Sequence, residues 1–445
     1  MLRTGYVEYP FNSLPPARRN SFAAFLPLDP KQNTAMSWIT RLGQLILVGL
    51  TAFGFKALLL FSLANGFVEH TQQPHVTGKF LGPSPQPSST QDGFKHEDVP
   101  MMPWLSGISQ RMDRQNQDFL IFMWPFVDGT RPDAALVFLN FAGAAGATWM
   151  LIVVESTRKA HQDKRLLAYV FPWGYLFFHY SHAMITPLYA VWNLFWSPLE
   201  DTSRYQDYMI NRVETVGLIF SQIVAYLIPM ALFAAPVPDV LSVFQKQTVV
   251  AWYQPWSVWI AVAHFLVTLV IRPWIRQPDP EGSTTVVYRS ARSNHRAIYA
   301  FAFSLAAIPH VIVLSIALTA MLYPGLYSNR LLGLLSLQNV FIPPSPWSDT
   351  KAPHLVEGCK WLLQWDYITG STGVLVWVLT RYIALQMSTS QDKRASWLGL
   401  AGKVLVWTVI AGPTAAAVEI LSERDEMVFD AAIEEATLAE AKKFS

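Results

Sequence analysis

Three carboxylic acids stand beside apolar stretches of this chain and are the first candidates for chemistry. Asp128 lies in WPFVDGTRP, Glu155 in WMLIVVESTR and Asp366 in WLLQWDYITGS. A charge at membrane depth is costly, so each carboxylate either marks an interface or has a specific role. Asp366 is flanked by Trp365 and Tyr367, and apolar aromatic surroundings favour a carboxylic acid that holds its proton. We therefore predict that Asp366 is a general acid.

Histidines and aromatic rings on one apolar stretch form a second group. His179 and His182 are one turn apart in FFHYSHAM, and further aromatic residues follow them. Rings could be core filler or an interface belt, which is the better interpretation for most of the 17 Trp residues. Ring faces also stabilise cations at close range. We therefore expect a substrate-binding lining made of His179, Tyr180, His182, Tyr189, Trp192 and Trp365.

Metal and cofactor motifs are missing from the apolar stretches. They contain no DDxxD or DxxxD pair for magnesium and phosphate, no zinc motif, and no nucleotide-binding fingerprint. Cys359 is the single cysteine, so a cysteine-rich metal site is excluded. We expect chemistry without a metal or a cofactor. The net charge of +2 indicates no nucleic-acid partner.

Composition and hydropathy place these residues in a membrane protein. Of 445 residues, 52% are hydrophobic and 14% charged, against roughly 25% charged in soluble domains. Apolar runs of about 20 residues, which can cross a bilayer core, recur along the chain. They predict an all-α, polytopic membrane bundle of about eight helices, near residues 37–64, 134–155, 168–196, 213–235, 250–272, 297–323, 361–387 and 397–421.

The remaining segments divide the chain. We expect a polar N-terminal segment over 1–36, a membrane domain over 37–421 and an acidic C-terminal tail over 422–445. The membrane domain contains a loop insertion, 67–133, whose apolar part at 119–126 is predicted to lie along the interface. The connection 324–360 holds LLGLLSLQNVF, which is too short to span and is predicted to be re-entrant or interfacial.

Two features make the topology difficult to assign. Pro172 and Pro187 predict a kink or a break in 168–196, with Pro187 as the favoured position. The basic connections 156–167 and 272–297 should both face the cytoplasm, yet three predicted helices separate them. Either one of those helices does not cross the membrane or one connection breaks the positive-inside rule.

The motifs together resemble a known family. The stretches WPFVDGTRPDAALVFLNFAGAAGATWMLIVVESTR, WGYLFFHYSHAMITPLYAVWNLFWSPL and WLLQWDYITGSTGVLVWVL are similar to fungal integral-membrane meroterpenoid (epoxyfarnesyl) terpene cyclases of the ascochlorin and ascofuranone type. The similarity covers roughly residues 120–390, where Asp128, Glu155 and Asp366 fall on acidic positions of the motifs. The resemblance implies secondary metabolism, an isomerase or lyase type of reaction, and residence in the endoplasmic reticulum.

The resemblance also implies a substrate and a reaction. The substrate would be a lipophilic farnesylated aromatic compound that enters from the membrane lipid, and the enzyme would protonate its terminal epoxide and direct ring closure. We expect Asp366 to be the donor, Glu155 a hydrogen-bonding or basic partner, and Asp128 a positioning group. Two other classes stay open. One is a transporter for a lipophilic metabolite, against which the absence of an internal repeat counts, and the other is a non-catalytic scaffold of a biosynthetic pathway.

Overall fold

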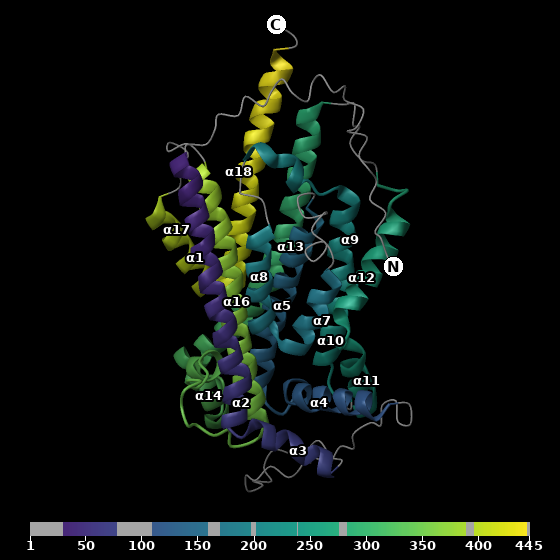
Figure 1. Ribbon diagram of the computed structural model, residues 1–445. Coiled ribbons are helices and arrows are strands. Elements are labelled where there is room, and N and C mark those ends of the chain that lie inside the picture. The colour runs from purple at the N-terminus through teal and green to yellow at the C-terminus, as the bar shows by residue number, and fades with distance from the viewer. Residues whose placement is uncertain are drawn as a thin grey trace.

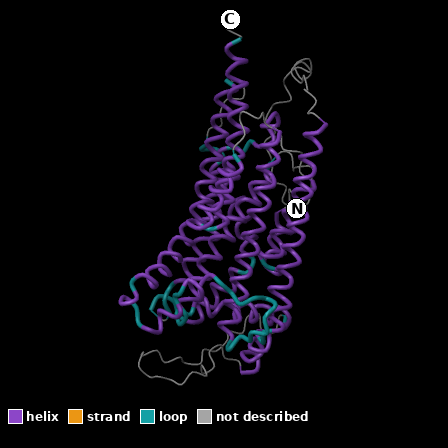
Figure 2. Tube along the Cα trace, turned by 90° about the vertical axis from the view of Figure 1, so that its left-hand side faces the viewer, coloured by secondary structure: helices purple, strands orange, loops and turns teal. Residues whose placement is uncertain are grey.

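The computed structural model describes residues 30–77, 109–158, 170–196, 202–237, 239–275, 283–388 and 396–442. Every regular element within these ranges is helical, and purple helices make up most of the trace in Figure 2. The expected all-α bundle is therefore confirmed. The segment 1–29, the Pro-Ser-rich stretch 83–90 and the end of the predicted tail lie outside the described residues.

The bundle is ordered around two long helices that run in the same direction, α5 (Pro132–Thr157) and α16 (Leu355–Ser388). Near their starts Lys360 Nζ lies 2.9 Å from Asp133 Oδ2, and near their ends Arg381 Nη1 lies 2.7 Å from Glu155 Oε2. We call the first level the lower end and the second the upper end, as they appear in Figure 1. Both ion pairs are buried, so they fix the register of the two helices.

Further helices surround this pair (Figure 1). The first helix of the chain consists of α1, the π-helical segment η3 and α2. A second π-helical segment, η6, joins α9 to α10. The bounds are α1 (Pro30–Gly54), η3 (Phe55–Leu60), α2 (Phe61–Ala64), α9 (Arg212–Gln222), η6 (Ile223–Leu227), α10 (Ile228–Ala234), α11 (Val243–Tyr253), α12 (Trp256–Ile271) and α13 (Thr284–Leu322).

Length and hydropathy make this bundle compatible with a membrane. Among the described residues, five helices are long and apolar enough to cross one, and six if the pair α11 and α12, bent by 75°, counts as one span. Apolar side chains also face outward, as Leu45, Leu269 and Leu405 show with exposed fractions of 71%, 61% and 64%. Lipid is the solvent in which such a surface is stable.

The predicted helix 168–196 is a hairpin. It consists of α7 (Val170–Tyr180) and α8 (His182–Trp196), separated by Ser181 with φ of 78°. Trp173 and Tyr189, each eight residues from Ser181, face each other across the hairpin with ring centroids 5.2 Å apart. The expected break is therefore present, but at Ser181, whereas Pro187 lies inside α8. A positive φ reverses the chain more sharply than a proline kink does.

The predicted helix 397–421 is a second hairpin. It contains α17 (Trp397–Ala411) and the start of α18 (Pro413–Ala441), with Gly412 at φ of 92° between them. Lys403 on α17 forms an ion pair of 2.6 Å with Glu423 on α18. At the apex, Thr414 Oγ1 donates to Ser371 Oγ of α16 over 2.9 Å. Both hairpins therefore return to the upper end after reaching the middle of α16.

These hairpins bear on two predictions. The count of about eight spans is not confirmed, because two of the eight windows fold back within the bundle. The boundary at residue 422 stays a prediction, and in the structure α18 continues through it to Ala441. Arg424 and Asp425, just past that boundary, are buried. Acidic residues there have basic partners on other helices, which the composition of the tail alone did not reveal.

The first hairpin also explains the two basic connections. Arg158, the first basic residue of the first connection, pairs with Asp425, and Arg292 and Arg296, the last two arginines of the second, pair with Glu426. Since Asp425 and Glu426 are neighbours on α18, both connections meet the bundle at the upper end. One of the three intervening windows does not traverse the bundle, as one of the two sequence alternatives required.

Short helices cover the lower end (Figure 1). Here α4 (Gln110–Val127) lies across the bundle, so residues 119–126 run over its end, while α3 (Phe67–Thr77) follows α2. The connection after α13 contains η7 (Pro324–Leu326), α14 (Asn329–Leu334) and α15 (Leu337–Phe341). Asn339 of α15 donates to Asp133 and accepts from Lys360, which attaches this connection to the lower end. At the upper end, η5 (Thr202–Tyr208) precedes α9.

Candidate functional site

Asp366 lies at the apex of the first hairpin. The residue is 4% exposed, and the backbone N–H of Ala183 donates to Asp366 Oδ1 over 2.5 Å. The first turn of a helix has unpaired N–H groups, so the reversal at Ser181 presents them to α16. Among the described residues no cationic side chain pairs with Asp366. The carboxyl group is therefore positioned by a neutral donor and not by a counter-charge.

His182 lies beside this carboxyl group, at the start of α8. Its side chain is fully buried, and its Nδ1 is 2.7 Å from Thr186 Oγ1. Its Nε2 has no hydrogen-bond partner among the described residues. Gly370, one turn after Asp366, makes room for the imidazole, because a Cβ atom on Gly370 would lie 2.2 Å from His182 Cδ2. When the Nδ1 hydrogen is donated to Thr186, Nε2 carries a free lone pair.

Aromatic rings extend from His182 into the bundle. The ring of Phe177 lies 5.2 Å from His182 and 5.7 Å from Trp256. Trp149 packs on Trp256 at 5.0 Å, and Tyr226 does so at 5.6 Å. These residues come from α7, α12, α5 and η6, so the rings pack together where four helices meet. Ring faces at such distances can stabilise a cation.

A second polar group lies on the other side of α16, at the apex of the second hairpin. Tyr367 Oη and Asn140 Oδ1 lie 3.2 Å and 3.3 Å from His310 Nδ1. Gly412 packs against both rings, because a Cβ atom on it would lie 3.0 Å from His310 Nδ1 and 3.1 Å from Tyr367 Oη. The two hairpin apices thus flank neighbouring residues of α16, Asp366 and Tyr367.

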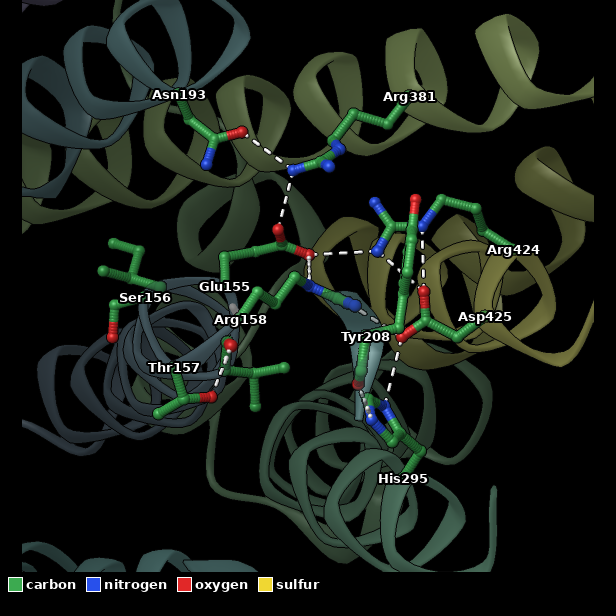
Figure 3. A network of polar contacts seen from close by, with 12 residues as sticks. Glu155, Ser156, Thr157, Arg158, Asn193, Tyr208, His295, Arg381, Arg424 and Asp425 are labelled. Atoms are coloured by element: carbon green, nitrogen blue, oxygen red, sulfur yellow. Dashed lines mark hydrogen bonds and ion pairs between the residues drawn. The ribbon is translucent and has the colours of Figure 1, made fainter. Parts of the chain in front are cut away.

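Glu155 belongs to a different environment at the upper end (Figure 3). Its Oε1 is 2.8 Å from Arg158 Nε and 3.0 Å from Arg424 Nη2, and its Oε2 is 2.7 Å from Arg381 Nη1. Arg158 and Arg424 also hold Asp425, at 2.8 Å and 2.7 Å. All five side chains are buried. The network joins α5, α16 and α18.

Asp128 lies at the lower end, in the turn between α4 and α5. Its Oδ1 accepts from the backbone N and the hydroxyl group of Thr130, each at 2.8 Å. Such a bond two residues along the chain is an Asx turn. The buried carboxylate next to it is Asp133, which binds Arg131 at 2.8 Å and Lys360 at 2.9 Å. Sequence reasoning did not select Asp133.

The three motif carboxylates are not brought together. Asp133 and Glu155 are 22 positions apart on α5, which corresponds to roughly 33 Å at the helical rise. Arg381, which holds Glu155, is 15 positions after Asp366 on α16, roughly 22 Å along the axis. Asp366 therefore lies at middle depth, with Asp128 below it and Glu155 above it. Direct proton transfer between Asp366 and Glu155 is excluded at this separation.

Of the six residues expected to line the site, His182 is placed beside Asp366. His179 faces Gln115, with its Nε2 3.0 Å from Gln115 Nε2, and Tyr180 is 55% exposed. Of the other three, Tyr189 is buried and contacts Trp173 and Trp377. Trp192 and Trp365 are half-buried, and they contact Trp196 and Phe53 of α1, respectively.

Sequence reasoning did not select two buried amides, Asn140, which lies with His310 and Tyr367, and Gln222 at the end of α9. An amide within an apolar window was the signal that could have found both. Within the described ranges, no three His, Cys, Asp or Glu side chains gather as a metal site would require. The arrangement offers a buried acid, an imidazole nitrogen and ring faces.

Comparisons with known proteins agree with the motif resemblance. The CtvD domain matches residues 43–429. The chain is 27% identical to terpene cyclase sdgD of Emericella nidulans, covering 85% of this chain and 93% of the relative. It is 26% identical to terpene cyclase ctvD of Aspergillus terreus (86% and 99% covered) and 23% identical to terpene cyclase ascI of Acremonium egyptiacum (87% and 92%). No solved structure matches the chain. This chain belongs to the CtvD-domain family, and its sequence resemblance to fungal meroterpenoid terpene cyclases is thereby confirmed.

Proposed function

We propose that this protein is a membrane terpene cyclase that opens the terminal epoxide of a farnesylated aromatic compound by acid and directs ring closure. The observation that carries the proposal is the position of Asp366. It is buried at a hairpin apex, has no cationic partner in the described part of the chain, and lies beside His182 and a series of aromatic rings. The relatives named terpene cyclases support the reaction class.

In the proposed reaction Asp366 donates its proton to the epoxide oxygen while the bond from that oxygen to the more substituted carbon breaks. The oxygen becomes a hydroxyl group and the carbon becomes cationic. A neighbouring alkene then supplies its electron pair to form the new ring bond, and ring faces stabilise the charge as it moves. Loss of a proton from the cation to His182 Nε2 gives a neutral product, and return of that proton from His182 to Asp366 restores the enzyme. Substrate and product are isomers, because one proton enters and one leaves.

The membrane arrangement belongs to the same proposal. Six crossings and two hairpins that enter from the upper end would place Asp366 near the middle of the bilayer. A lipophilic substrate could then reach the rings from the lipid. We infer residence in the endoplasmic reticulum, with the basic upper end in the cytoplasm. Asp128 would act as a positioning group, because its bonds to Thr130 hold the turn that leads from α4 into α5 at the lower end.

Direct conversion tests the proposal. Membranes containing the protein are incubated with a farnesylated phenol that carries a terminal epoxide, and products are separated and weighed by mass spectrometry. We expect a cyclic isomer of unchanged mass that forms equally in EDTA, because no carboxylate cluster for a metal lies in the membrane stretches. Loss of product in EDTA that added magnesium restores would contradict the mechanism.

The two hairpins favour one alternative, a transporter for a lipophilic metabolite. Paired discontinuous helices that meet at middle depth are a feature of secondary transporters. Purified protein in sealed vesicles separates the two functions. A cyclase converts the epoxide without moving it to the vesicle interior, whereas a transporter moves it unchanged.

A further inference from the structure

Two buried polar side chains, Gln222 and Trp149, have groups without a hydrogen-bond partner among the described residues. Gln222 is 0% exposed, and neither its Oε1 nor its Nε2 has a hydrogen bond to a described residue. The indole Nε1 of Trp149, on a side chain that is 1% exposed, has none either. Burying an amide without a partner is costly. Such buried polar groups are usually found where a ligand or an ordered water supplies the missing hydrogen bonds.

Both groups lie on segments that meet at Trp256. Gln222 lies four positions before Tyr226, and residues four apart share a helix face. Tyr226 packs against Trp256, and Trp256 packs against Trp149. Tyr226 is already satisfied, since its hydroxyl group donates to Ala142 O over 2.7 Å. The π-helical segment Ile223–Leu227 begins directly after Gln222, and such segments occur often at functional sites.

The same rings connect this place to the acid. From His182, which adjoins Asp366, the path runs through Phe177 to Trp256 and then to Tyr226, with centroid steps of 5.2, 5.7 and 5.6 Å. An extended molecule lying along this path would have one end at Asp366 and the other at Gln222. The path consists of aromatic rings, and their apolar surfaces match the apolar prenyl chain of the proposed substrate.

We propose that Gln222 and Trp149 bind the oxygen-bearing aromatic head of the substrate while the prenyl chain extends toward Asp366. The inference rests on the proposed function. The Gln222 amide can accept from a phenolic hydroxyl group and donate to a carbonyl oxygen, and the Trp149 indole can donate to either. The surrounding rings carry no charge, so the site fits a neutral phenol or carbonyl group and not a diphosphate.

The test compares two substrates in the membrane assay. One is the farnesylated phenol epoxide, and the other is its analogue without the ring oxygen. We expect Q222L to raise KM for the phenol about tenfold, the effect of one lost hydrogen bond, while leaving KM for the analogue and both kcat values near wild type. W149F, which keeps a ring and removes the N–H donor, should shift KM in the same direction.

Thermal stability distinguishes a binding role of Gln222 from a purely structural one. Replacing an unpaired buried amide by an apolar side chain of similar size should leave the thermal unfolding temperature unchanged or raise it. The control is Q386L, because Gln386 is also buried but bonds to Tyr382 Oη and Met427 Sδ. Q386L should lower the unfolding temperature and should not discriminate between the two substrates.

Each failure has a separate signature. If wild-type membranes cyclise neither substrate, the proposed function is wrong. If wild type cyclises both and Q222L shifts KM equally for the two, or for neither, the amide holds a water molecule or nothing, and the inference about the head group is overturned.

Discussion

Glu155 and Asp366 are both buried carboxyl groups on the interior of one bundle, yet their surroundings differ in charge. Three guanidinium groups, from Arg158, Arg381 and Arg424, hold Glu155 within 3.0 Å. Asp366 instead accepts from the backbone N–H of Ala183 and lies beside neutral rings. Buried charge is tolerated when it is paired, so Glu155 carries the negative charge that its partners require.

The difference assigns separate roles to the two carboxyl groups. A carboxylate that neutralises several cations has no proton to give, and it joins α5, α16 and α18 at the upper end. A carboxyl group without a counter-charge is more easily protonated in an apolar interior. We therefore propose that Asp366 is the proton donor and that Glu155 holds together the helices that position Asp366. The experiments below test this division.

The largest expected effect is that of Asp366→Asn on product. Asn keeps the shape and an oxygen that can accept from Ala183 N, so the protein should stay folded. It has no acidic proton, and loss of a general acid costs about 10²–10⁴-fold in rate. We expect product below detection with an unfolding temperature near wild type. Turnover near wild type would remove Asp366 from the mechanism.

Glu155→Gln should act mainly on stability. Removing one member of a buried ion network leaves cations uncompensated and costs about 3–5 kcal/mol. We expect lower accumulation and a lower unfolding temperature in detergent. The double variant Glu155→Gln with Arg381→Gln should be less destabilised than the sum of the single variants. A Glu155→Gln protein that is as stable as wild type but inactive would instead support the basic role expected from the sequence.

Gly370→Ala should have an intermediate effect, because the added methyl group would lie 2.2 Å from His182 Cδ2. Forcing an atom into a packed interior costs about 1–3 kcal/mol, and displacing His182 should lower kcat. Gly402→Ala is the matched control, since nothing lies within 4 Å of a Cβ atom there. That variant should be neutral or slightly stabilised by helix propensity. Equal kcat in both variants would exclude His182 from the site.

The smallest effect concerns Glu440 at the end of α18, far from both carboxyl groups. Hydrogen bonds from Ser283, and then from Thr285, lower the pKa of Glu440 below its ordinary value of 4.5. A lowered folded-state pKa stabilises the folded state above the ordinary value, and that stabilisation is lost as pH falls through the folded pKa. We expect α18 to become more sensitive to protease below about pH 4.5, and Glu440→Gln to remove this pH dependence without changing turnover.

The sequence by itself determined the class of the molecule and the family. Apolar windows of bilayer length predicted a helical membrane bundle because helices satisfy their own backbone hydrogen bonds in lipid. The motif spacing identified the family, and the aromatic flanks of Asp366 indicated a buried acid. Proline punctuation also indicated that 168–196 would not be a straight helix.

The tertiary structure decided which windows fold back and which charges meet. Hydropathy cannot separate a full span from two half-depth helices, because both are apolar, and reversals at Ser181 and Gly412 depend on contacts with α16. Glu155 lies 226 positions before Arg381 and 269 before Arg424. Local sequence contains no information about such distant partners, so the charge state and role of a buried carboxyl group follow from packing between helices.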